Sequence, residues 1–126
     1  MATSAAHQNK ALHNEQFVRH YDLGSGEFAG WAVTALFYSA VHLFRALIVA
    51  SDLRDVRDCK GEHRAAERLL RTGVLDTQAW GWYEFLKNSS RNARYEMMPF
   101  TPADFEQINR DWFTPFRAFA LSRLNP

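Results

Sequence analysis

The stretch WAVTALFYSAVHLFRALIVA, residues 31–50, decides the fold because its apolar residues recur with the period of an α-helix. One face of this helix carries Val33, Phe37, Val41, Phe44 and Ile48. A second face carries Trp31, Ala35, Tyr38 and His42. A helix that is apolar on two faces usually lies at the centre of a bundle, so we expect a central core helix over residues 27–51.

The same stretch is long enough to cross a bilayer, but it contains Arg45. A charge well inside a membrane span costs about 2.5–3.5 kcal/mol on insertion scales, which favours a core helix over a membrane helix. Residues 1–7 lack the basic segment and apolar run of a signal peptide. Cys59 is the only cysteine, which excludes an intramolecular disulfide and favours a reducing, cytoplasmic location.

The apolar spacing is helical in the rest of the chain as well, and no stretch alternates long enough to predict a strand. We expect further helices over residues 6–21, 61–71 and 77–98 and from Pro102 onward. Asp76 and Thr101 are the predicted N-caps, and Gly73 is the predicted helix stop. The last helix is expected to kink or restart at Thr114-Pro115. For the helix over residues 77–98, the predicted buried residues are Ala79, Trp82, Leu86, Ala93 and Met97.

The fold class predicted from this pattern is all-α: an up-down bundle of five helices, a four-helix bundle plus one extra helix. Residues 1–126 fit a single domain, with residues 1–6 as a flexible tail. Residues 22–26 and 52–60 are the expected turn and charged connector. Fifteen basic and fourteen acidic residues leave a net charge of +1, so only a local cluster of charge could attract nucleic acid.

Three segments in order resemble the HEPN superfamily: ALFYSAVH at residues 35–42, Glu62-His63-Arg64, and SRNARY at residues 90–95. They are similar to the second-helix pattern, the third-helix opening and the fourth-helix signature of that superfamily. The resemblance covers residues 28–95 and implies a four- or five-helix bundle that dimerises. In HEPN domains that cut RNA, an Arg and a polar residue are followed a few positions later by a His.

The resemblance places Arg91 at the position of the Arg and Asn92 at the polar position. The His would fall at Glu96, Met97 or Met98, and none of these is His. RNA cleavage without a metal needs a proton carrier with a pKa near 7, which His supplies and Arg does not. Glu96 would repel a phosphate, and its pKa would have to rise well above ~4.3 for it to act as an acid.

The first hypothesis is therefore a non-catalytic HEPN-like binding module, acting as a homodimer or beside a partner such as a nucleotidyltransferase. Arg91, Arg94 and Tyr95 share one helix face, where two guanidinium groups and a ring could hold phosphate and stack a base. With Asn92, they would bind a nucleotide, an RNA segment or the partner protein. The alternative for both arginines is that they pair with carboxylates across the bundle or across a dimer.

A second hypothesis is a divergent, toxin-like ribonuclease in which His63 or His42 lies close enough to Arg91 to share one phosphodiester. The simpler interpretations are that His63 is a solvated residue at a helix start and that His42 belongs to the core. A third hypothesis is a structural dimer with Trp80, Trp82 and Tyr83 at its interface, because aromatic residues are enriched there.

We expect no metal and no other cofactor. His7, His13 and His20 are six and seven residues apart, whereas helical pairs of metal ligands are four apart. Arg64, Arg68 and Arg71 are spaced as a basic stripe, which Glu62 and Glu67 make more typical of a solvated, ion-paired face.

Overall fold

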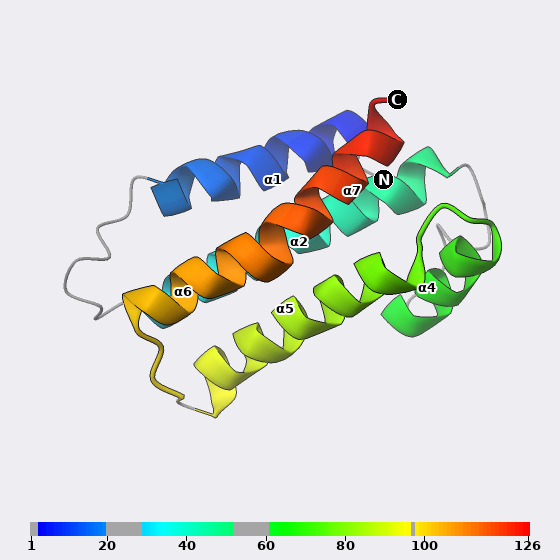
Figure 1. The fold of residues 1–126 in the computed structure, drawn as a ribbon. Coiled ribbons are helices and arrows are strands. Elements are labelled where there is room, and N and C mark those ends of the chain that lie inside the picture. Colours follow the sequence, from blue (N-terminus) through cyan, green and yellow to red (C-terminus); the bar gives the residue numbers. More distant parts are fainter. Residues whose placement is uncertain (1–2, 20–28, 52–60, 97) are drawn as a thin grey trace.

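A computed structural model describes residues 3–19, 29–51, 61–96 and 98–126, and these form an all-α fold without a strand (Figure 1). The elements are α1 (Ser4–Arg19), α2 (Ala29–Ala50), α4 (Glu62–Arg71), α5 (Thr77–Tyr95), α6 (Pro102–Ile108), the π-helix η1 (Asn109–Phe113) and α7 (Thr114–Leu124). The last three follow one another directly, so the described residues form the five predicted helices. The expected turn at residues 22–26 and connector at residues 52–60 lie outside the described residues.

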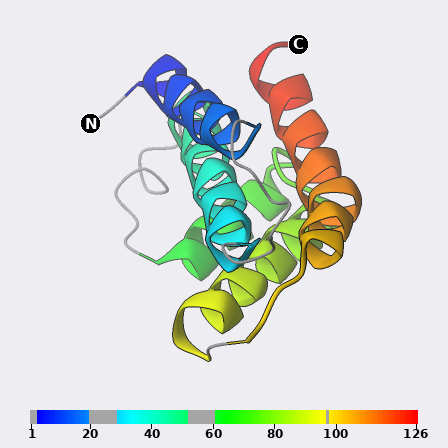
Figure 2. The same cartoon turned by 90° about the vertical axis from the view of Figure 1, so that its left-hand side faces the viewer.

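The long helices run alternately up and down. In Figure 1, α1 and α5 point in one direction, whereas α2 and the continuous helix from α6 to α7 point in the opposite direction. Seen from the end of the bundle in Figure 2, α2 lies between α1, α5 and α7. The sequence-based expectation of a central helix over this stretch is confirmed.

The predicted helix starts and stops are confirmed by their hydrogen bonds. Asp76 accepts a hydrogen bond of 2.7 Å from the Ala79 amide at the start of α5. Thr101 and Asp104 form a reciprocal capping box at the start of α6. Gly73, after α4, has a φ of 79°, the left-handed conformation that glycine adopts without strain.

Two boundaries differ from the prediction. The first helix begins at Ser4, so residues 4–6, which we assigned to a flexible tail, are helical. The second difference is at the end of α5, which stops at Tyr95 instead of Met98. The Met98 amide donates a hydrogen bond to the Asn92 carbonyl.

One hydrophobic cluster contains residues from every helix, and Tyr83 is among its largest members. The Tyr83 side chain is fully buried, its ring stacks on Phe44 at 4.9 Å, and its hydroxyl donates a 2.8 Å hydrogen bond to Glu62. The prediction that Trp82 and Ala93 belong to the buried stripe of α5 was wrong, because both are only half-buried. Tyr83 therefore cannot contribute to a dimer interface, as the third hypothesis required. Met97 lies outside the described residues.

The two faces of α2 differ more than their composition indicates. Val33, Phe37, Val41 and Phe44 are buried, as predicted. Trp31 and Tyr38, expected to pack on the second face, are 65% and 43% exposed. By length and composition α2 could cross a membrane, but 67% of its most apolar window is buried within this chain.

The chain stays helical through Thr114-Pro115, where we predicted a kink or a restart. A wide turn precedes the proline, and the Thr114 amide donates to the carbonyl of Asn109, five residues back. Buried residues here step from Ile108 directly to Phe113, while Trp112 is half-buried and stacks on Phe85 at 3.7 Å. The extra residue of the π-turn thus brings Phe113 to the core side of the helix.

Candidate functional site

The last turn of α5 places Arg94 between two aromatic rings. Its guanidinium carbon lies 4.9 Å from the centre of the Tyr95 ring and 5.8 Å from that of Tyr38. A guanidinium Nη also donates a 3.2 Å hydrogen bond to the Tyr38 hydroxyl, and Nε donates to the Ser90 carbonyl at 3.3 Å. These contacts hold the guanidinium in one orientation.

The rings beside Arg94 remain open to solvent. Tyr95 is 68% exposed and Tyr38 is 43% exposed. Trp31 lies two helical turns before Tyr38 on α2 and is also exposed. We refer to Trp31, Tyr38, Arg94 and Tyr95 as the aromatic–arginine surface.

The other two predicted site residues lie next to this surface. Arg91 is exposed, three residues before Arg94 and therefore on the same side of α5. Asn92 is half-buried, and its backbone carbonyl accepts the hydrogen bond from Met98. Within the described part of the chain, neither Arg91 nor Arg94 forms an ion pair, so the alternative of pairing with carboxylates across the bundle is not observed there. Pairing across a dimer stays a prediction.

The contacts of His63 on α5 lie at least seven residues before Arg91. His63 is exposed at the start of α4, where its ring contacts Trp80 edge-on at 5.8 Å and its Nδ1 lies 3.8 Å from a Glu84 oxygen. Glu84 precedes Arg91 by seven residues, which is about 10 Å along a helix. On α5 between Glu84 and Arg91, Lys87 forms a 3.0 Å ion pair with Glu62.

Sequence reasoning missed a pair of histidines. His42 is half-buried at the edge of α2, and its Nδ1 lies 3.0 Å from Nδ1 of His7 on α1, with the two rings stacked at 5.3 Å. Burial and the nearby Arg45 lower the pKa of His7. Burial also lowers the pKa of His42, and His7, Arg45 and Lys10 lower it further. Helical periodicity could not predict this contact, because the two residues are 35 positions apart.

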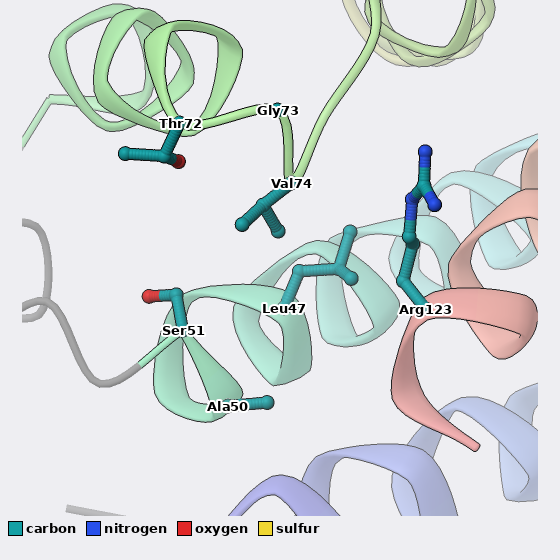
Figure 3. Close-up of a pocket in the computed structure, with 7 residues that line it drawn as sticks. All are labelled: Leu47, Ala50, Ser51, Thr72, Gly73, Val74 and Arg123. Carbon is teal, nitrogen blue, oxygen red and sulfur yellow. The ribbon is translucent and has the colours of Figure 1, made fainter. Parts of the chain in front are cut away.

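Described residues also line cavities away from the aromatic–arginine surface. One, of about 260 Å³, lies between the end of α2, the turn around Gly73 and Arg123 of α7 (Figure 3). The hydroxyls of Ser51 and Thr72 at its rim already donate to backbone carbonyls of their own helices. Another, of about 250 Å³, lies where α1 meets the π-turn and includes the buried Glu15 and its partner Arg117.

Groups of three or more potential metal ligands do not occur among the described residues. The chain was also compared with protein-family models, with curated proteins and with solved structures, and none of them matched it.

Proposed function

We propose that this chain is a non-catalytic, HEPN-like binding module of the cytoplasm that binds single-stranded RNA or a nucleotide through the aromatic–arginine surface and Arg91. The observation that carries the proposal is the Arg94 guanidinium, held between the Tyr38 and Tyr95 rings while both rings stay exposed. Asn92, half-buried beside Arg91, belongs to the edge of this site.

The chemistry of this surface suits a nucleotide. A guanidinium forms charge-assisted hydrogen bonds with phosphate oxygens, often two at once. An exposed tyrosine ring offers a face on which a base can stack, and such stacking contributes about 1–3 kcal/mol per base. Because every base has an aromatic face, we expect binding with little sequence preference.

The geometry favours binding over cleavage. Both ring neighbours of Arg94 are tyrosines, and His63 is held beside Trp80 and Glu84 instead of at the last turn of α5. The Arg94 guanidinium can neutralise phosphate charge but cannot carry a proton. His42 lies one turn from Tyr38 on α2, but its Nδ1 already contacts His7, and burial lowers its pKa, so it carries a proton less readily than a free imidazole.

Fluorescence anisotropy with a labelled oligouridylate tests the proposal. We expect Arg94→Met to weaken binding about tenfold, because it removes a charge-assisted contact with phosphate. Tyr95→Ala should weaken binding by about fivefold or more, the lower limit for loss of one stacked base. Arg64→Met, which removes the same charge from an exposed position of α4, is the matched control.

Two results would contradict the proposal. One is no binding of the wild-type chain to the oligonucleotide or to nucleoside mono- and triphosphates. The other is equal weakening by Arg94→Met and Arg64→Met, which would reduce the effect to net charge. Cleavage of the RNA that disappears in Arg91→Ala would instead support the ribonuclease alternative.

A second candidate function, self-association, is favoured by the exposure of Trp31. Trp31 is 65% exposed on a core helix, and tryptophan is enriched in protein–protein interfaces. We propose that the chain forms a homodimer, or docks on a partner such as a nucleotidyltransferase, at this end of α2. Sedimentation at several concentrations should show a dimer in the wild type that Trp31→Ser weakens, and a concentration-independent monomer would refute the homodimer.

A further inference from the structure

Four basic side chains of α1 and α2 gather beside the aromatic–arginine surface. His7 and Lys10 lie one turn apart on α1, and His42 and Arg45 lie one turn apart on α2. The two helices meet at the 3.0 Å contact between the imidazoles. Both imidazoles are half-buried, whereas Lys10 and Arg45 are exposed.

The charged groups of this cluster are all basic. Among the described residues, the charged groups that act on His7 and His42 are Arg45, Lys10 and the histidines themselves, and all of them disfavour protonation. From α5, the Tyr83 hydroxyl lies near Arg45, and this hydroxyl donates a hydrogen bond to Glu62. Glu62 in turn pairs with Lys87. Cations that are held together without a carboxylate between them form a ready site for an anion.

We propose that His7, Lys10, His42 and Arg45 form a binding site for a phosphate group. Lys10 and Arg45 supply permanent positive charge at its rim, and each imidazole supplies a ring N–H. In the unliganded chain one imidazole donates to the other, so the accepting ring is neutral. A bound anion lets both rings carry protons, because each then donates to an anion oxygen instead of facing the other cation.

This geometry couples phosphate binding to protonation. An anion that prefers the doubly protonated pair must raise the affinity of both rings for protons, since the linkage is reciprocal. Affinity for the anion therefore increases as the pH falls through the lowered pKa values of the two histidines. A metal ion would meet the opposite electrostatics, because Arg45 and Lys10 repel it.

The cluster can be tested with sulfate, a tetrahedral oxyanion whose charge stays constant over the pH range in which histidines titrate. The C2 protons of the histidines are followed by NMR in sodium sulfate and in sodium chloride of equal ionic strength, with single His→Gln variants for assignment. We expect sulfate to raise the pKa of His7 and His42 by about half a unit, which is about a threefold preference for the protonated form. His63, which is exposed on α4, serves as the internal control.

Variants at the exposed cations separate this site from general screening. Arg45→Gln and Lys10→Gln should each weaken binding of inorganic phosphate about threefold, as expected for one partly solvated ion contact, and Arg71→Gln on α4 should not. Arg94→Met should leave the sulfate effect unchanged, so this proposal and the RNA-binding proposal fail separately. Equal pKa values of His7 and His42 in sulfate and chloride, or equal shifts of all the histidines, would overturn the proposal.

Two sources of the phosphate group are distinguished by competition. His42 and Tyr38 are four residues apart on α2, so an RNA strand on the aromatic–arginine surface could place a backbone phosphate in the cluster. In that case a short oligouridylate should compete with sulfate at least about tenfold better than inorganic phosphate does, and Arg94→Met should abolish this advantage. Equal competition by the two would identify free phosphate as the ligand of the same site.

Discussion

Replacing Arg117 by Met should destabilise the fold strongly, because it leaves the Glu15 carboxylate buried without its partner. Glu15 is 8% exposed, and its Oε1 lies 2.6 Å from Nε of Arg117 in the link between α1 and α7. Methionine keeps the aliphatic stem of arginine and removes its charge, so the variant isolates the ion pair.

The magnitude follows from the burial of the two partners. Removing one member of a fully buried pair costs about 3–5 kcal/mol, whereas exposed pairs contribute about 0–1 kcal/mol. The Arg117 side chain is 35% exposed, so water reaches the site in part. We therefore expect Arg117→Met to lower the free energy of unfolding by about 2–3 kcal/mol.

The double variant Glu15→Gln/Arg117→Met should recover most of this loss, since it removes the unpaired charge together with its partner. Urea denaturation of the wild type, both single variants and the double variant measures the coupling through shifts of the midpoint at constant slope. A coupling below about 0.5 kcal/mol would refute the claim that the pair acts as a buried unit.

The stability lost in Arg117→Met should also increase with pH. Burial raises the pKa of Glu15 above its usual value, although Arg117 and Arg19 partly oppose the rise. A carboxyl group with a raised pKa in the folded state favours folding when protonated, and this contribution is lost as the pH rises through the folded-state value. Without Arg117 that pKa rises further, so the difference between wild type and Arg117→Met should be small near about pH 4 and larger near about pH 7.

Four further substitutions should change stability by amounts that urea denaturation resolves. Gly73→Ala should lower the free energy of unfolding by about 1–2 kcal/mol through the positive φ alone, since a Cβ there meets no atom within 4 Å. Gly81 has equal room but lies inside α5, so Gly81→Ala should raise the free energy of unfolding by about 0.5–1 kcal/mol. Thr101→Ala should cost about 1 kcal/mol by removing the capping box, and a change under a few tenths would contradict that role. Tyr83→Phe should cost about 1–2 kcal/mol, because Glu62 loses a buried donor but keeps its lysine; no loss would mean that the hydroxyl is replaced by water.

The periodicity of the sequence predicted which residues of α2 enter the core, but not how many faces of the helix are covered. Phe37 and Phe44 are buried because α5 packs on their side, where their rings contact Tyr83 and Trp80. Trp31 and Tyr38 are equally apolar, yet the neighbouring helices leave them exposed. Spacing identifies apolar side chains on one face, and only the packing of other helices decides whether that face meets protein or water.

The candidate site shows the same division between local and distant information. Arg94 and Tyr95 are adjacent on one helix, so their proximity was predictable from the sequence. The participation of Tyr38 depends on the antiparallel register of α2 and α5, which joins residues 56 positions apart. The core position of Tyr83 instead of Trp82 was not predictable either, because a shift of one residue on a helix changes the buried aromatic without changing the pattern.

The wide turn of η1 also sets where the chain can change its length. In a regular α-helix, with about 100° per residue, Ile108 and Phe113 would point about 140° apart, and a chain one residue shorter between them would bring them to about 40°. Such a deletion would straighten the helix while keeping Phe105 and Phe116 on their common side. A deletion within α7 would instead turn every later side chain by about 100° and expose Ala120, so length variation is expected at the π-turn and not beyond it.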